Sequence, residues 1–161
     1  MKLVQIGVIH TPFSQASGAP LQPRMTRGAK GAVEVFEPFV VGLRDLEGFD
    51  RIWLLYCFHR ASAPQIEIMP FLDSAARGLF ATRAPCRPNP IGISSVGLIG
   101  IAGNTLQVED VDMLDGSPLL DIKPFVPDFD CYGVKGCDCL SSILSNSQAH
   151  PSNGRFECKI S

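Results

Sequence analysis

Short apolar runs, each bounded by glycine, proline or aspartate, recur along this chain and restrict the folds available to it. Branched and aromatic residues dominate the runs, which is typical of β-strands. The 161 residues suit one ordinary domain, and 15 glycines with 13 prolines argue against a long helical bundle. The expected strands are Leu3–Ile9, Ala32–Val41, Arg51–Phe58, Gly78–Thr82, Ile91–Ile101, Thr105–Val111 and Leu119–Ile122.

Strands with one apolar face each must cover one another, and a small closed or partly open β-barrel does this while removing open edges. The run Arg51–Phe58 is apolar on both faces, which predicts a central strand. Gly103-Asn104 lies between two strand-like runs and predicts a tight hairpin. We therefore predict a mainly β protein with few short helices. The helix candidates are Leu43–Glu47, Phe71–Arg77 and Cys139–Leu144.

The formal net charge of −2 conceals an uneven distribution of charge. Ser74 to Gln107 contains no Asp or Glu but several arginines, whereas Glu109 to Asp130 is strongly acidic. Acid-free basic segments suit phosphates or a carboxylate if they meet in space, although surface arginines are often only solvated. The candidate nucleic-acid contacts are Arg24, Arg27, Lys30, Arg77 and Arg87.

The run from Arg83 to Gly92 holds three prolines around two arginines. Proline fixes the backbone, so ordering these arginines costs less entropy than on a glycine-serine loop. Rigid loops with charged tips commonly bind ligands.

Four blocks of sequence resemble, in the same order, the TsaA-like (TrmO) family of S-adenosylmethionine-dependent tRNA N6-methyltransferases. The resemblance covers about Lys2 to Asp130. Its most specific parts are Arg-Pro-Asn-Pro-Ile-Gly at 87–92 and Asp-Gly-x-Pro-x-x-Asp-Ile-Lys-Pro at 115–124. The four blocks are Ile6–Phe13, Leu46–His59, Gly78–Ser94 and Asp112–Pro124.

The resemblance implies a β-barrel methyltransferase without a Rossmann fold, and the chain has no Gly-x-Gly strand-to-helix turn that would contradict this. It implies a homodimer that binds S-adenosylmethionine near the subunit interface. The reaction implied is N6-methylation of threonylcarbamoyl-adenosine beside the tRNA anticodon. Residues 1–130 would form the methyltransferase domain, and 131–161 a cysteine-containing appendage.

The resemblance also implies which residues contact the methyl donor. Arg83 would pair the donor carboxylate, Ile93 would cover the adenine, and the Asp112–Asp115 loop would face the cationic end or the ribose. Leu21 departs from the family pattern, in which an arginine stands between the proline and the glutamine. The matching positions are Pro20, Leu21, Gln22, His59, Arg60, Arg83, Ile93, Asp112, Met113, Leu114 and Asp115.

The N6 nitrogen of the implied substrate belongs to a urea-like group and is a poor nucleophile until its proton leaves, so a general base is needed. The candidates are His59, Asp112 and Asp115, and the sequence does not rank them. His59 could instead cap the end of a strand, and Asp115-Gly116 is a common turn dipeptide.

Two other functions stay open at this stage. One is a methyltransferase acting on a different substrate, and the other is a non-catalytic barrel that binds nucleic acid or senses the methyl donor.

The absence of a signal-peptide-like apolar block favours the cytoplasm, and no membrane segment is expected. We assign no metal site, although Cys131, Cys137, Cys139 and Cys158 could be free thiols, metal ligands or redox-active.

Overall fold

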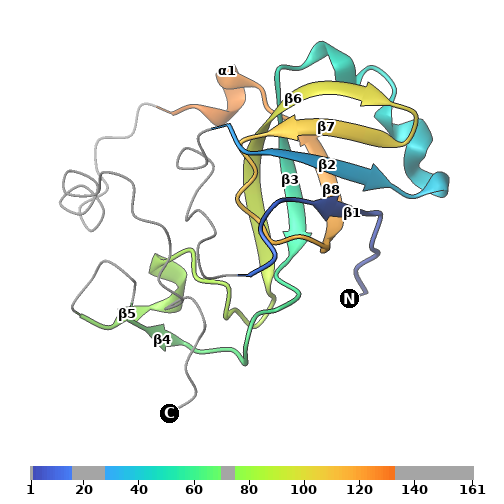
Figure 1. Cartoon of the computed structure of the whole chain (residues 1–161). Coiled ribbons are helices and arrows are strands. Elements are labelled where there is room, and N and C mark those ends of the chain that lie inside the picture. Colours follow the sequence, from blue (N-terminus) through green and yellow to red (C-terminus); the bar gives the residue numbers. More distant parts are fainter. Residues whose placement is uncertain (1, 16–27, 70–74, 133–161) are drawn as a thin grey trace.

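Six antiparallel strands close into a barrel in the order β1-β2-β7-β6-β3-β8 (Figure 1). The structure is a computed structural model that describes residues 2–15, 28–69 and 75–132. The barrel confirms the predicted mainly β fold. Its strands are β1 (Gly7–His10), β2 (Lys30–Val35), β3 (Arg51–Cys57), β6 (Ile91–Ala102), β7 (Thr105–Glu109) and β8 (Ser117–Pro124).

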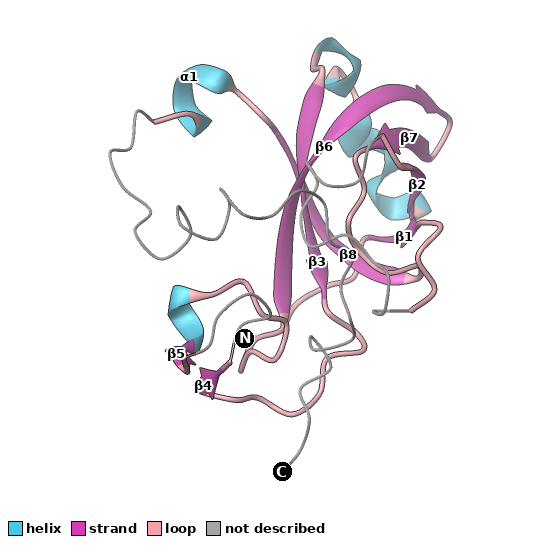
Figure 2. Ribbon diagram, turned by 60° about the vertical axis from the view of Figure 1, so that its left-hand side comes forward, coloured by secondary structure: helices cyan, strands magenta, loops and turns pink. Residues whose placement is uncertain are grey.

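A second, two-stranded sheet pairs β4 (Glu67–Ile68) with β5 (Arg77–Gly78) in the long connection between β3 and β6. Both ribbon views place it outside the barrel, beyond the start of β6 (Figures 1 and 2). None of the helices in the described ranges has the length and apolar character needed to cross a membrane. The described helices are 3₁₀ helices at Glu37–Leu43, Leu46–Gly48 and Leu79–Ala81, and α1 at Pro127–Asp130.

The core lies inside the barrel, because side chains alternate between its two faces along each strand. In β3, Ile52, Leu54 and Tyr56 are buried while their neighbours are half-buried. The 3₁₀ helices between β2 and β3 add Leu43 and Leu46 to the same cluster. The apolar pattern of β3 therefore reflects an inner face in the core and an outer face that is partly covered.

Several predicted element boundaries are wrong for local reasons. The strand expected at Ala32–Val41 ends at Val35, and a 3₁₀ helix with proline in its first turn follows. In the run Gly78–Thr82, Gly78 ends the strand β5, and Leu79–Ala81 form a 3₁₀ helix.

The expected helices also differ from the structure. Leu43–Glu47 is split by Asp45, which has a φ of 67°, into the ends of two 3₁₀ helices. The described end of Phe71–Arg77 enters β5, while residues 71–74 and Cys139–Leu144 lie outside the described residues. The hairpin at Gly103-Asn104 is confirmed, with a φ of 63° at Gly103 between β6 and β7.

The strand directions bring distant residues to one end of the barrel. The ends of β1, β3 and β7 meet the starts of β2, β6 and β8, as the pairs His10–Ala32 and Cys57–Ile91 show. The loop of residues 110–116 connects β7 to β8 at this end. We call this end the 110–116 rim.

Candidate functional site

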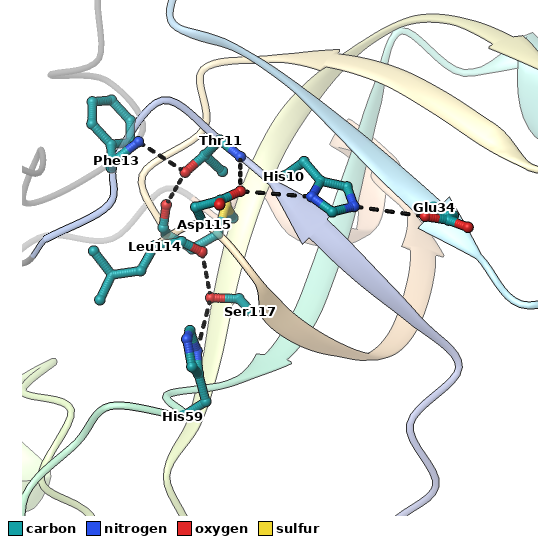
Figure 3. A network of polar contacts seen from close by, with 9 residues as sticks. His10, Thr11, Phe13, Glu34, His59, Leu114, Asp115 and Ser117 are labelled. Carbon is teal, nitrogen blue, oxygen red and sulfur yellow. Dashed lines mark hydrogen bonds and ion pairs between the residues drawn. The ribbon is translucent and has the colours of Figure 1, made fainter.

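The 110–116 loop is fixed against the segment that follows β1. The Thr11 backbone N–H donates to Asp115 Oδ1 at 3.1 Å, and the Thr11 hydroxyl donates to the Met113 carbonyl oxygen at 2.9 Å (Figure 3). The backbone N–H of Asp115 donates to the Phe13 carbonyl oxygen at 2.8 Å. With its backbone held at these points, the loop presents its acidic side chains in a defined geometry.

Asp112 ends a chain of hydroxyl groups that begins inside the barrel. The Ser94 hydroxyl donates to Asp112 Oδ1 at 2.6 Å and lies 3.1 Å from the buried Tyr56 hydroxyl. Burial raises the pKa of Asp112 from an ordinary value of 3.8 to about 6, although the Ser94 hydrogen bond and the Arg83 charge act in the opposite direction. Asp112 is therefore a carboxylate that can take up a proton near neutral pH.

Gly92, the glycine of the Arg-Pro-Asn-Pro-Ile-Gly block, leaves the space that the Tyr56 ring occupies in this hydrogen-bonded series. A Cβ at residue 92 would lie 2.5 Å from Cε2 of Tyr56 and 2.9 Å from its hydroxyl oxygen. Any side chain there would push the Tyr56 ring away and break its contact with Ser94. The motif glycine thus supports the geometry of Asp112. Burial, followed by the nearby Asp112 charge, raises the pKa of Tyr56 and keeps its hydroxyl protonated.

Arg83 lies on the connection between β3 and β6 and is exposed. Its positive charge lowers the pKa of both Asp112 and Tyr56, so its guanidinium is close enough to act on both groups. Within the described part of the chain, no hydrogen bond or ion pair holds this guanidinium. Arg83 is available to an anionic ligand at the rim.

His59 and Asp115, the other candidate bases, lie at the same rim but are engaged differently. His59 Nδ1 is 3.5 Å from the Ser117 hydroxyl, and burial followed by the Arg60 charge lowers its pKa. Asp115 accepts the Thr11 backbone hydrogen bond and lies 3.6 Å from His10 Nδ1 (Figure 3). These contacts give Asp115 a structural role in the loop.

The other residues predicted to contact the methyl donor differ in their exposure and in their contacts. Ile93 is 51% exposed and points away from the interior, opposite to its neighbour Ser94. The Met113 side chain packs in the core, and Arg60 donates to the Ser14 carbonyl oxygen at 2.6 Å. Leu114 accepts the Ser117 hydroxyl through its carbonyl oxygen. Pro20, Leu21 and Gln22 lie outside the described residues.

The predicted nucleic-acid contacts are only partly described. Lys30 begins β2 opposite Glu109, and Arg77 lies in β5; both are exposed. Arg87 is half-buried and donates to the carbonyl oxygens of Thr82 at 3.1 Å and Ala84 at 3.4 Å. Arg24 and Arg27 lie outside the described residues.

Sequence reasoning missed Tyr56 and Ser94. Tyr56 continues the apolar alternation of β3 and is interpreted from sequence as an ordinary core residue, and a single serine in a strand gives no distinctive signal. The available signal was the position of Ser94, two residues after the motif glycine, where it shares the inner face with Gly92.

Of the three cysteines in the described residues, one is disulfide-bonded and two are free thiols. Cys86 is buried and disulfide-bonded, whereas Cys57 and Cys131 are free. Cys137, Cys139 and Cys158 lie outside the described residues, so the roles suggested for the tail stay predictions.

Comparisons with known proteins identify the family of this chain. The model of the tRNA-methyltransferase O N-terminal domain matches residues 8–131. A probable S-adenosyl-L-methionine-binding protein of Pyrococcus abyssi is 51% identical over 94% of this chain and 82% of its own length. A tRNA (adenine(37)-N6)-methyltransferase of Escherichia coli is 35% identical over 76% of this chain and 57% of its own length.

A crystal structure of TrmO superposes with a TM-score of 0.74 at 37% identity, covering 86% of this chain and 64% of that chain. The protein thus spans somewhat less than two thirds of that TrmO chain. Together with the barrel and the rim that carries Arg83 and Asp112, the match of the family model over most of the chain shows that this protein belongs to the TrmO family.

Proposed function

We propose that this protein is an S-adenosylmethionine-dependent methyltransferase that methylates N6 of threonylcarbamoyl-adenosine beside the tRNA anticodon. The observation that carries the proposal is the Tyr56–Ser94–Asp112 chain together with Arg83, whose guanidinium has no hydrogen-bond or ion-pair partner among the described residues. The names of the relatives support the donor and the adenine N6 chemistry. The threonylcarbamoyl group comes from the resemblance described above.

The residues at the rim fit this methyl donor. Arg83 offers a planar guanidinium to the donor carboxylate, and the acidic 110–116 loop favours a cationic ligand. When bound, the donor supplies a methyl group already activated by its sulfonium. The protein is left to hold the nucleophile, methyl carbon and sulfur in line at a preorganised site.

Asp112 is the general base in this proposal. It accepts the N6 proton as the nitrogen–methyl bond forms and the sulfur–methyl bond breaks. Ser94 and Tyr56 are positioning residues that hold the carboxylate through Oδ1. His59 and Asp115 are less suited, since their contacts at the rim hold them to Ser117 and Thr11.

Lys30, Arg77 and the basic residues outside the described ranges are proposed phosphate contacts for tRNA. The homodimer with a donor site near its interface, the cytoplasmic location and the domain boundary after residue 130 stay predictions.

Calorimetric titration of the protein with S-adenosylmethionine tests the donor site. We expect saturable binding with one donor per chain. An absence of binding at millimolar donor would contradict both methyltransferase readings and leave only a non-catalytic RNA-binding barrel.

A further inference from the structure

Phe80 lies in the long connection between β3 and β6, and 77% of its surface is accessible. Its neighbour Leu79 is fully buried. A single exposed apolar side chain needs no explanation, since much of any protein surface is apolar. The contacts around Phe80, however, hold its ring in place, and nearby arginines add positive charge.

The short helix that carries Phe80 is anchored on both sides. The Leu79 N–H donates to the Ile66 carbonyl oxygen at 2.8 Å, and the Thr82 hydroxyl donates to the Leu79 carbonyl oxygen at 2.7 Å. Buried Leu79 therefore holds the backbone while Phe80 projects outward. A side chain ordered before binding loses little entropy when a ligand covers it.

Arg87 supports the ring. Its guanidinium carbon lies 5.7 Å from the centroid of Phe80, within the range of a cation–π contact. Its hydrogen bonds to the carbonyl oxygens of Thr82 and Ala84 direct the guanidinium to this position. Arg87, which the sequence suggests as a phosphate contact, thus acts first as a support for Phe80.

The charged residues nearest to Phe80 in sequence are arginines, while Glu67 of β4 pairs with Gly78, two residues before Phe80. Arg77 precedes it by three residues, Arg83 follows it by three, and no Asp or Glu occurs from 74 to 107. Arg83 also acts on Asp112, which connects this surface to the rim. A supported aromatic ring among arginines suits a ligand with negative charges and flat bases, and unpaired RNA bases stack on such rings.

We propose that Phe80 is a stacking platform for an unpaired base of the RNA substrate, next to the adenosine served by Asp112. The proposal rests on the proposed function and adds a residue that recognises the single-stranded loop. A fully paired RNA cannot use this platform, because its bases are stacked inside the duplex.

The test compares Phe80→Ala with Phe129→Ala, since Phe129 is 72% exposed on α1, beyond the opposite end of β8. The probe is an RNA stem-loop with the sequence of the anticodon arm. Phe80→Ala is expected to weaken its binding by about 5- to 150-fold, and Phe129→Ala by less than about twofold. The salt dependence of binding stays unchanged in Phe80→Ala, because no phosphate contact is lost.

Phe80→Trp provides a direct signal. Trp53 is the only tryptophan of the natural chain, so stacking at residue 80 should add fluorescence quenching that the unaltered protein does not show with the same stem-loop. A duplex of the same sequence should give no added quenching.

Three results would overturn the proposal. They are equal RNA affinities for the two alanine variants, an equal loss of affinity for stem-loop and duplex in Phe80→Ala, and conversion of a dimer to a monomer by Phe80→Ala. The last would assign the ring to a second copy of the chain. If the unaltered protein transfers no methyl group while Phe80→Ala still loses stem-loop binding, the proposed function fails and the platform stands.

Discussion

Replacing Asp112 with asparagine is expected to lower the rate of methyl transfer by about 10²- to 10⁴-fold, the range typical for loss of a general base. Asparagine keeps an oxygen that can accept the Ser94 hydrogen bond, now 2.6 Å long, so the hydroxyl chain is preserved. Donor affinity is therefore expected to change little. Single-turnover transfer of labelled methyl groups, together with calorimetry, separates the two effects.

The same substitution is expected to stabilise the fold at neutral pH. The pKa of Asp112 is about 6 in the folded protein, above its ordinary 3.8, so the folded state binds this proton more tightly. The free energy of unfolding therefore falls as pH rises from about 3.8 to about 6. Asparagine does not ionise, so the variant does not lose this stability. We expect Asp112→Asn to raise the free energy of unfolding by about 1–3 kcal/mol at neutral pH and to have little such effect near pH 3.

Two further variants make this result specific. Asp128→Asn, at an exposed position on α1, should leave transfer and stability unchanged. His59→Gln should retain most of the activity. If His59→Gln abolishes transfer while Asp112→Asn retains it, the base is His59. A loss of donor binding in Asp112→Asn would instead assign the carboxylate to the donor's cationic end.

Replacing Arg83 with alanine is expected to weaken S-adenosylmethionine binding by about 10- to 150-fold, because a charged hydrogen-bonding partner of the donor carboxylate is lost. The substitution should also raise the pKa of Asp112 further, since the Arg83 charge now lowers it. The acidic limb of the rate profile, expected near pH 6 in the unaltered protein, should move to higher pH.

Arg83→Lys keeps the positive charge but loses the planar guanidinium. Compared with Arg83→Ala, it should therefore return the acidic limb toward its original pH more fully than it restores the affinity for the donor. Arg44→Ala is the matched control, because Arg44 is exposed near the opposite end of the barrel, after the first 3₁₀ helix. Equal donor affinities for Arg83→Ala and Arg44→Ala would remove Arg83 from the donor site.

The barrel was predictable because its signal is repeated. Each apolar run needs a covered face, and the runs that became β3, β6, β7 and β8 were located to within a few residues. The predicted strand was wrong where an apolar run forms a turn. Gly78–Thr82 has the composition of a strand, but its main apolar anchor is Leu79, and the backbone turns after it.

Arg83, His59 and Asp112 could be brought to one site in advance only through the family motifs, since they are distant in sequence and meet through strand pairing. The hydroxyl chain behind Asp112 was not predictable in the same way. Tyr56 and Ser94 belong to different strands, and their contact depends on the register of β3 against β6. Phe80 was also missed, because the exposure of one residue in a short apolar run depends on tertiary packing.

The proposed substrate is tested most directly by the transfer of labelled methyl groups from S-adenosylmethionine to two otherwise identical tRNAs, with and without the threonylcarbamoyl group on the adenosine beside the anticodon. We expect labelling of the tRNA that carries the group, with the methyl on N6, and background labelling of the other. Equal labelling of both tRNAs, or of neither, would contradict the proposal.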